Sequence, residues 1–334
     1  SREDRDESMI EELRAKAGKS VKENESLAPH TTMKVGGPAQ FFLEAKTADE
    51  AAVAANAAKE LGLPLFVFGG GSNMLVNDEG VKGLVIKMAN RGLKIEGVSV
   101  TVDAGAPSGL VAMKTADAGL SGFEWAAGLP GTIGGAIRGN AGMFGGELRD
   151  SLESIRVLKD GLEKSMTNAE CEFGYRDSLF KRTPGHVILS AVLKLKKSDD
   201  PAASKALLKK YLLDKKDKQP VEFPSAGCIF TNWKPPAPED LERLRKYLDL
   251  NKEERIPMTP HGAVPAGWII DRAQLKGTKM GHVMVSEKHG NFIVHDGKAT
   301  TSEIIALIGI IKTRVRNMTE AMVMLLEEVE YVGF

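Results

Sequence analysis

The chain has 334 residues, and its 45 lysines and arginines balance its 45 aspartates and glutamates. This length predicts two or three domains with sizeable cores, and zero net charge offers no electrostatic footprint for nucleic acid or an anionic membrane. Two cysteines cannot build a disulfide framework or a four-ligand zinc site, and without an apolar leader or membrane span a cytoplasmic protein is expected.

The first part of the chain alternates strands and helices. A charged, helical and solvated tail is expected at residues 1–25, followed by a short strand at 40–44. Thr47 and Glu50 fit a capping box at the start of an alanine-rich helix, and Gly62 stands where a left-handed residue would end that helix. Next come a short buried strand at 64–68, strands at 84–87 and 98–103, and a helix at 108–118. This alternation is typical of an α/β layer domain.

The second part begins with strands near 154–158 and 187–195. A lysine-rich helical segment at 198–220, broken at Pro201 and ended by Pro220, is interpreted as a connector between domains. Beyond it, helices are predicted at 238–250 and 302–316, with a strand at 291–295 between them and a final strand over 321–332.

Glycine is in excess and is concentrated in two stretches. Gly69-Gly70-Gly71-Ser72-Asn73 directly follows a predicted strand, and ten of the 28 residues from 119 to 146 are glycine. Glycines let successive backbone N–H groups converge on an anionic oxygen, and Ser72 and Asn73 add side-chain donors. The two loops therefore suit the diphosphate of a dinucleotide cofactor; the alternative is a pair of tight turns. Neither loop matches the Rossmann or P-loop pattern.

Seven motifs occur in order between residue 30 and the C-terminal region: HTTMKVGGPA at 30–39, GGGSNML at 69–75, GLPGTIGG at 128–135, GYRDS at 174–178, PSAG at 224–227, AGWIID at 266–271 and QLKG at 274–277. Together they resemble the UDP-N-acetylenolpyruvoylglucosamine reductase family, in its shorter second subtype. The resemblance implies an α+β fold with α/β elements. It combines a two-part FAD-binding domain of the vanillyl-alcohol-oxidase/PCMH type with a smaller C-terminal α+β substrate domain.

The resemblance also implies a division of the chain. A tail at 1–25 precedes the FAD-binding domain at 26–200, whose subdomains cover about 26–88 and 89–200. A connector at 201–220 leads to the substrate-binding domain at 221–318. The last segment, 319–334, would carry a catalytic glutamate.

The implied reaction reduces the enolpyruvyl group of a UDP-sugar to lactyl, giving UDP-N-acetylmuramate for peptidoglycan. NADPH would reduce non-covalently bound FAD, and hydride would pass from flavin N5 to the enol ether. A monomer without nucleic-acid or membrane partners is expected. The implied cofactor-binding residues are Gly69, Gly70, Gly71, Ser72, Asn73, Met74, Gly128, Pro130, Gly131, Ile133, Gly134, Gly135, Asn140, Ala141 and Gly142.

Three residues are implied to carry the chemistry. Arg176 would hold the substrate carboxylate and the developing enolate, because a guanidinium is always charged and binds a carboxylate through two hydrogen bonds; the alternative is an arginine paired with Asp177 on a surface turn. Cys228 stands where the family has a serine proton donor. A thiol is a better acid than an alkanol, although a small buried cysteine, as expected for Cys171, is the alternative.

The third residue is a glutamate that pairs with the donor. Glu327, Glu328 and Glu330 compete for this role, and three clustered carboxylates are ordinarily a solvated face. The family pattern of glutamate directly before valine selects Glu328.

Substrate or NADPH contacts are implied at Tyr175, Asn232, Gln274, His289 and Asn291. Trp233 replaces the usual proline beside Asn232, so the local turn is expected to differ. The histidines show no metal-ligand spacing, and no metal site is expected.

Two other functions stay open at this point. One is another flavin-dependent oxidase or dehydrogenase of the same fold; many of these tether the flavin through His or Cys, and neither residue lies in the 69–75 loop. The other is a catalytically inactive nucleotide-binding protein.

Overall fold

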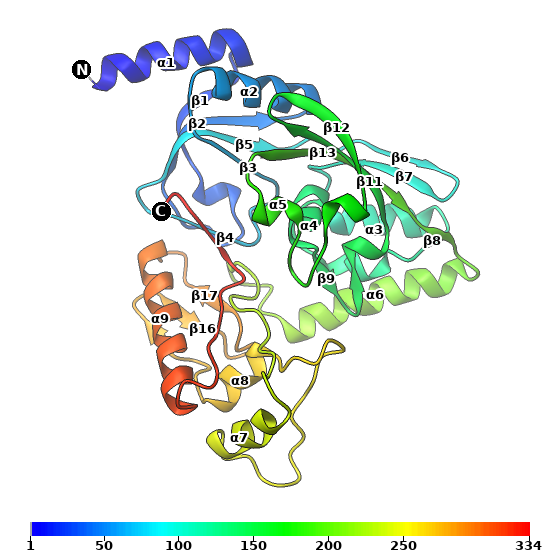
Figure 1. Cartoon of the computed structure of the whole chain (residues 1–334), viewed down its shortest axis with the longest axis vertical. Helices are drawn as coiled ribbons and strands as arrows, with labels where there is room; N and C mark the ends of the chain where they lie inside the picture. Colours follow the sequence, from blue (N-terminus) through cyan, green and yellow to red (C-terminus); the bar gives the residue numbers. More distant parts are fainter. Residues whose placement is uncertain (1) are drawn as a thin grey trace. The chain divides into compact units, whose positions relative to one another are not determined.

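The computed structural model describes the backbone from Arg2 to Phe334 and the side chains from Glu7 onward (Figure 1). The chain forms two compact units. Unit 1 contains the residues up to Ser26, then Pro38–Gly70 and Val81–Lys215. Unit 2 contains Leu27–Gly37, Gly71–Gly80 and Lys216–Phe334. Two short N-terminal segments thus fold with the C-terminal unit, and the glycine loop at 69–73 passes from one unit to the other.

Unit 1 begins with a four-stranded sheet of order β1-β2-β5-β3. Its strands are β1 (Lys22–Ser26), β2 (Pro38–Ala45), β3 (Leu65–Phe68) and β5 (Val81–Met88), with β5 parallel to both β2 and β3. Helix α2 (Ala48–Glu60) packs against β2 and β5 through its buried alanines (Figure 1). Gly62 has φ +63°, as predicted for the residue after the helix.

Three details of this region differ from the sequence expectation. Thr47 caps α2 by accepting from the Glu50 N–H, but the Glu50 carboxylate accepts from Lys46 N–H, one residue before the position of a capping box. Strand β3 is not fully buried: Leu65 is exposed, and Phe68 is its one buried residue. Helix α1 (Arg2–Ala17) is not a solvated tail, because Ile10 and Leu13 are buried in the core and the helix contacts α2.

The second part of unit 1 is a five-stranded antiparallel sheet of order β12-β11-β13-β7-β6. Its strands are β6 (Leu93–Glu96), β7 (Ser99–Asp103), β11 (Leu152–Lys159), β12 (Leu162–Thr167) and β13 (His186–Lys194). Two small antiparallel pairs accompany it: the hairpin of β9 (Gly142–Met143) with β10 (Gly146–Glu147), and the long-range pair of β8 (Leu120–Ser121) with β14 (Lys196–Lys197).

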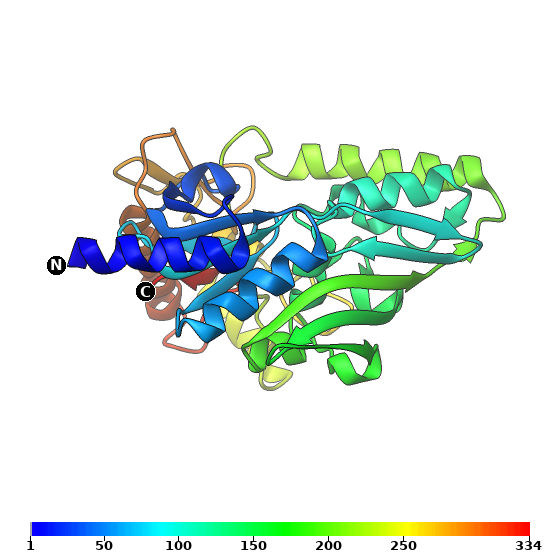
Figure 2. The same cartoon turned by 90° about the horizontal axis from the view of Figure 1, so that it is seen from above.

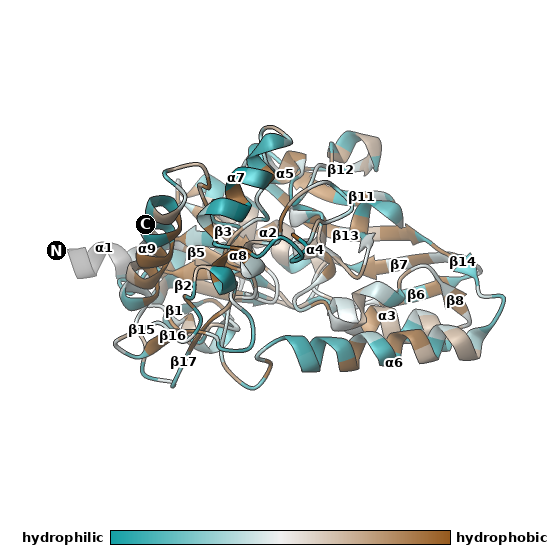
Figure 3. Cartoon of the chain, turned by 90° about the horizontal axis from the view of Figure 1, so that it is seen from below, coloured by the Kyte–Doolittle hydropathy of each residue, from teal (hydrophilic) through white to brown (hydrophobic). Residues whose placement is uncertain are grey.

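The helices of this part are α3 (Ser108–Asp117), α4 (Ile133–Gly139), α5 (Leu179–Arg182) and α6 (Pro201–Lys218), with short 3-10 turns at Glu124–Gly128, Leu148–Asp150 and Ala169–Cys171. Helix α6 begins at Pro201, where proline is tolerated, so this residue does not break it. Figures 2 and 3 both show α6 running beside α3. In Figure 3 the central strand β13 carries mostly hydrophobic residues, as expected for a strand in the middle of a sheet that packs against helices.

Unit 2 combines a small sheet, three helices and a two-stranded parallel pair. The sheet has the order β15-β16-β17, with β15 (Lys279–Met280), β16 (Val283–Val285) and β17 (Ile293–His295). The helices are α7 (Glu239–Tyr247), α8 (Ala266–Arg272) and α9 (Thr301–Met318); a 3-10 turn covers Ala28–His30. Strand β4 (Met74–Val76) pairs in parallel with β18 (Glu330–Val332). Among the described helices, none is long and apolar enough to cross a membrane.

Long-range hydrogen bonds attach the N-terminal segments to unit 2. His295 Nε2 donates to the Met33 carbonyl at 2.6 Å, and both residues are buried. Asp78 accepts from the N–H groups of Thr301 and Ser302 at 2.8 and 2.9 Å, which caps α9. A capping box between Thr300 and Glu303 completes the start of this helix.

The predicted strand over 321–332 is mostly wrong. Only Glu330–Val332 forms a strand, and Glu327 makes an isolated bridge with Phe230. The apolar residues of this segment alternate between buried Val323 and Leu325 and exposed Met324 and Leu326, so they satisfy a strand pattern without forming a ladder.

Candidate functional site

The glycine loops of unit 1 lie against each other. A Cβ atom on Gly70 would lie 2.7 Å from Gly131 Cα, and one on Gly69 would collide with Thr132. Real Cβ atoms do not approach so closely, so glycine is required at both positions. In unit 2, Gly71 needs glycine for another reason, because its φ is +61° and a Cβ would lie 2.6 Å from the His30 carbonyl oxygen. Close packing therefore explains part of the glycine excess.

Helix α4 begins directly after the second glycine loop. Its first two N–H groups, of Ile133 and Gly134, donate to the carbonyls of Ala106 and Ala104 at 3.0 and 2.8 Å. These two donors are therefore committed to protein acceptors. Gly134 also packs against Ala104, with 3.0 Å between a hypothetical Cβ and the Ala104 Cβ.

Some buried polar atoms around the second glycine loop have no hydrogen-bond partner among the described residues. They are Ser108 Oγ, Thr132 Oγ1 and Trp125 Nε1. The Ser108 N–H donates to the Gly131 carbonyl at 3.1 Å, so its orphaned hydroxyl belongs to the same loop region as Thr132. A buried hydroxyl without a partner costs free energy. These atoms fit a polar cofactor that would accept from or donate to them, and the donor set is therefore compatible with a dinucleotide.

In unit 2, the N–H groups of Gly71, Ser72 and Asn73 donate to no acceptor among the described residues. The Asn73 side chain has already used one of its donors, because its Nδ2 binds the Glu328 carbonyl at 3.1 Å. The other predicted cofactor residues are placed as follows: Met74 is buried in β4, Ile133 is buried, Gly128 is buried, Pro130 and Gly135 are exposed, and Ala141 donates to the Ala136 carbonyl.

Asn140 is completely buried and adopts φ +41° at the end of α4. Its amide nitrogen donates to Glu147 and to the Gly174 carbonyl at 3.2 and 2.8 Å, and its oxygen accepts from Arg149 N–H. The side chain is thus used within the protein, and it holds the segment that carries Arg176 next to the end of α4.

Arg176 is half-buried and has φ +51°. Its guanidinium donates to the Gly142 carbonyl at 2.8 Å and lies 5.4 Å from the Tyr175 ring centre. Asp177, which the surface-turn alternative paired with Arg176, forms an ion pair with Arg182. Arg176 therefore has a positive φ, a strained conformation for a non-glycine residue, and contacts one of the predicted cofactor residues, Gly142.

Helix α6 contributes residues that sequence reasoning missed. Lys215 Nζ donates to the Gly128 carbonyl at 2.6 Å, and burial lowers the pKa of this lysine. One turn earlier, Tyr211 stacks on Phe144 with ring centres 4.3 Å apart. The segment interpreted as a connector thus supports the second glycine loop and the β9–β10 turn. In the sequence, Tyr211 and Lys215 are four residues apart and so lie on one face of the helix; this spacing could have identified them as a pair that contacts the same neighbour.

Three distant segments of unit 2 meet at Cys228. The Ile229 carbonyl, one residue after Cys228, accepts from the Glu328 N–H at 2.8 Å. Asn73 binds the Glu328 carbonyl through its side chain and accepts from the Glu330 N–H at 3.0 Å. We call this arrangement of Asn73, Cys228, Ile229 and Glu328 the Cys228 junction. It brings the backbone positions of the predicted thiol and carboxylate together, and both residues are half-buried.

The structure separates the competing glutamates. Glu327 forms an ion pair with Lys312 at 2.9 Å and accepts from the Tyr331 hydroxyl at 3.4 Å. Burial and the Glu327 carboxylate raise the pKa of Tyr331 to about 12. Glu327 is therefore already bonded to Lys312 and Tyr331.

Cys171 in unit 1 is a buried structural cysteine: burial raises the pKa of its thiol to about 11, and its Sγ lies 3.3 Å from the Thr167 carbonyl.

The predicted substrate residues differ in their exposure and in the hydrogen-bonding groups that the protein leaves unused. Asn232 Oδ1 accepts from the Ala266 N–H at 3.1 Å, and its Nδ2 has no acceptor among the described residues. Trp233 N–H donates to the Val264 carbonyl at 2.9 Å and its C=O accepts from the Val264 N–H at 2.7 Å; a proline at this position could not donate the first of these bonds. Tyr175 and Gln274 are exposed.

His289 and Asn291 lie on one turn before β17. His289 Nδ1 accepts from the Asn291 N–H at 3.1 Å, so the ring proton resides on Nε2. Burial, together with the nearby Lys276 charge, lowers the pKa of His289. The Asn291 amide is buried and bonded to Phe230 on both sides.

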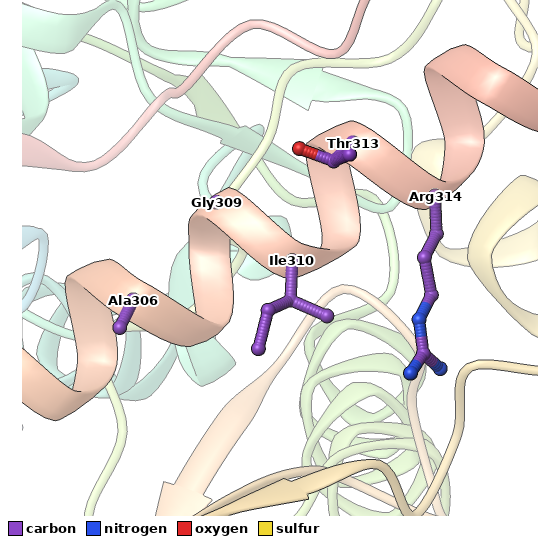
Figure 4. A pocket seen from close by; sticks show the side chains of 5 residues that line it. All are labelled: Ala306, Gly309, Ile310, Thr313 and Arg314. Atoms are coloured by element: carbon purple, nitrogen blue, oxygen red, sulfur yellow. The ribbon is translucent and has the colours of Figure 1, made fainter.

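The described residues form no metal site, and a hollow on the surface of unit 2 contains none of the predicted site residues. Among residues 7–334, no three His, Cys, Asp or Glu side chains gather as metal ligands. A surface hollow of about 470 Å³ follows one face of α9 and is lined by Ala306, Gly309, Ile310, Thr313 and Arg314 (Figure 4). None of these five residues was predicted to bind cofactor or substrate.

Comparison with known proteins matches the N-terminal and the C-terminal part of the chain to two domain families. The profile of the FAD binding domain matches residues 39–161, and the profile described as "UDP-N-acetylenolpyruvoylglucosamine reductase, C-terminal domain" matches residues 219–332. The fold is therefore the FAD-binding type expected from the sequence, with a separate C-terminal α+β domain, and the cofactor is FAD.

Relatives cover nearly the whole chain. The UDP-N-acetylenolpyruvoylglucosamine reductases of Bacillus velezensis and Bacillus subtilis are 36% and 35% identical, over 98% of this chain and 99% of theirs. The crystal structure of the Thermus caldophilus reductase has a TM-score of 0.72 at 32% identity and covers 93% of this chain and 98% of that one. The chain therefore belongs to the UDP-N-acetylenolpyruvoylglucosamine reductase family of oxidoreductases.

Proposed function

We propose that the protein reduces the enolpyruvyl ether of UDP-N-acetylglucosamine-enolpyruvate to UDP-N-acetylmuramate, with NADPH as reductant, for peptidoglycan precursor synthesis. The observation that carries this proposal is the Cys228 junction. A proton donor and a carboxylate are held on neighbouring backbone segments by the 2.8 Å hydrogen bond from Glu328 N–H to the Ile229 carbonyl.

The reaction adds one hydride and one proton across a carbon–carbon double bond. FAD, proposed to be held by the glycine loops at 69–73 and 128–135, would supply the hydride chemistry between NADPH and the enolpyruvyl group. The substrate carboxylate must bind a cation, since negative charge develops on it as an enolate. Arg176 is the proposed cation, and its guanidinium is already oriented by the Gly142 carbonyl and the Tyr175 ring.

The proton completes the reduction at the carbon next to the carboxylate. Cys228 is the proposed donor, since a thiol with an ordinary pKa near 8.5 is mostly protonated at neutral pH. Glu328 is proposed to hold the thiol in place. Asn232 Nδ2 is a proposed donor to the substrate, since its oxygen is committed to the start of α8.

The test is NADPH oxidation by the purified, FAD-loaded protein with and without the enolpyruvyl sugar. We expect oxidation that depends on the sugar, one NADPH per sugar consumed, and a product two mass units heavier. Oxidation that proceeds at the same rate without the sugar would identify an oxidase and overturn the proposal.

A further inference from the structure

One residue, Asn291, makes several of the hydrogen bonds that hold the segment after Cys228. Asn291 is 3% exposed; its Oδ1 accepts from the Phe230 N–H at 2.9 Å, and its Nδ2 donates to the Phe230 carbonyl at 2.8 Å. Its own carbonyl accepts from the Ile229 N–H at 2.9 Å. Three hydrogen bonds from one residue therefore fix the two residues next to Cys228.

Ile229 is held from its other side by Glu328. The Ile229 N–H points to Asn291, and the Ile229 carbonyl accepts from Glu328 N–H. A side-chain amide has the same donor and acceptor as a peptide group, so Asn291 takes the place of a neighbouring strand. The backbone at Cys228 is thus clamped between the turn before β17 and the C-terminal segment.

Asn291 is itself held by a hydrogen-bonded turn. Ser286 Oγ accepts from the N–H groups of Lys288 and His289 at 3.1 and 3.3 Å, and His289 Nδ1 accepts from the Asn291 N–H. The neutral imidazole keeps a lone pair for that bond. The polar groups of the turn thus lead to the Asn291 amide and from there to Phe230.

We propose that Asn291 is a positioning residue, which orients the Cys228 thiol for proton transfer and does not bind substrate. Both atoms of its amide that could bind a ligand are bonded to Phe230, at distances of good hydrogen bonds. The inference rests on the proposed function only where it says that Cys228 donates the proton. The clamp itself concerns the position of Cys228 and has a readout that needs neither cofactor nor substrate.

The first measurement is alkylation of Cys228 by iodoacetamide, followed by mass spectrometry of the peptide. Asn291→Ala removes both side-chain bonds to Phe230, so the segment moves and the alkylation rate of Cys228 changes several-fold. Cys171, completely buried in unit 1, is the internal reference and keeps its rate. The same rate at Cys228 in parent and variant would overturn the clamp.

The second measurement separates the half-reactions of the FAD-loaded enzyme. Bleaching of the flavin by NADPH should stay within about twofold, while reoxidation by the enolpyruvyl sugar falls on the order of 100-fold, as expected for a misplaced catalytic group. A raised KM for the sugar with unchanged kcat and unchanged Cys228 alkylation would make Asn291 a substrate ligand and refute the proposal.

Matched variants separate positioning from general stability. Asn168→Ala in unit 1 also removes two amide hydrogen bonds, to the Arg149 and Leu152 carbonyls at 2.8 and 2.7 Å. It should lower the melting temperature without changing Cys228 alkylation or the balance of the half-reactions. If Asn291→Ala does not fold, Asn291→Leu decides, because it has nearly the same volume and removes both the donor and the acceptor that bind Phe230.

The two proposals fail in different ways. A parent enzyme whose reduced flavin is not reoxidised by the sugar refutes the proposed function, whereas alkylation still reports the clamp. A parent that works and an Asn291→Ala or Asn291→Leu variant indistinguishable from it in both measurements refutes the clamp alone.

Discussion

The glycine loop of unit 1 and the Cys228 junction of unit 2 are built by different kinds of contact. In the loop, Gly70 and Gly131 approach so closely that no side chain fits between their backbones. In the junction, Asn73 binds Glu328 across 255 residues of sequence through a hydrogen bond to the backbone carbonyl. A steric contact restricts which residues are allowed, and glycine makes it visible in the sequence. A bond to a backbone carbonyl leaves the second partner unrestricted.

This difference predicts different consequences of mutation. Changes in the glycine loop should act on cofactor binding and stability, because they move backbone. Changes at the Cys228 junction should act on the proton step, because the thiol and carboxylate are proposed to carry it. The following substitutions test that contrast, from the largest expected effect to the smallest.

Removal of the thiol should have the largest effect. Cys228→Ala should slow reoxidation of the reduced flavin by the enolpyruvyl sugar by about 1000-fold, the scale of general acid catalysis, and leave bleaching by NADPH intact. Cys228→Ser should retain substantial activity, because a hydroxyl also donates a proton. Rapid-mixing absorbance of the flavin measures both steps. Parent-like reoxidation in Cys228→Ala would remove Cys228 from the reaction.

The neighbouring glutamates give a matched pair. Glu328→Gln should slow the same reoxidation by about 10- to 100-fold, because the carboxylate proposed to hold the thiol is lost. Glu327→Gln breaks the ion pair with Lys312, which is partly exposed and therefore costs less than about 1 kcal/mol, and should leave the rate unchanged. Stopped-flow rates for the two variants decide between the carboxylates. The reverse order of effects would assign the role to Glu327.

A side chain in the glycine loop should weaken the cofactor site of unit 1. Gly70→Ala would place a Cβ 2.7 Å from Gly131 Cα, so the loop must shift at a cost of about 1–3 kcal/mol. FAD titration should show weaker binding. Gly139→Ala is the control, because nothing lies within 4 Å of its hypothetical Cβ; its effect on stability should stay within about 1 kcal/mol. Equal FAD affinity in the parent and Gly70→Ala would contradict the tight loop contact.

The elements that were predicted correctly have local causes. Thr47 as N-cap and Gly62 in the left-handed region depend on residues adjacent in sequence, and both are found. The burial of β3 depends on what covers its faces, which the run of apolar residues cannot specify. Residues 321–329 satisfy a strand pattern, but their backbone meets Ile229 and Thr231 through separate hydrogen bonds, so no ladder forms.

The candidate site also has features that the local sequence predicts and features that depend on distant partners. The glycines predicted the two loops. They did not predict that the N–H groups of Ile133 and Gly134 would donate to protein carbonyls. Asn291 stands in a motif that suggested a ligand contact, whereas its amide binds Phe230, 61 residues away. The contact of Lys215 with Gly128 was not predicted, because Lys215 lies in a segment interpreted as a connector. Each difference comes from a partner distant in sequence, which a local pattern does not contain.

The smallest expected effect comes from a second long-range bond of unit 2 that the proton step does not use. Although partial burial alone would raise it, hydrogen bonds from Thr301 and Ser302 lower the pKa of Asp78. Asp78→Ala leaves the first N–H groups of α9 without this cap and should cost about 1 kcal/mol, with parent-like rates in both half-reactions.

The pH dependence of that cost has a definite sign. Because the folded-state pKa of Asp78 is lowered, its stabilisation is present above the unfolded value of about 3.9 and is lost as the pH falls through the lower folded value. The difference in melting temperature between parent and Asp78→Ala should therefore be constant near neutrality and shrink below about pH 4. Asp78→Asn keeps one acceptor, so it should be more stable than Asp78→Ala by a margin that does not change with pH, because neither side chain titrates. A slowed proton step in Asp78→Ala would show that long-range bonds of unit 2 are coupled, and that the Cys228 junction cannot be treated separately from the cap of α9.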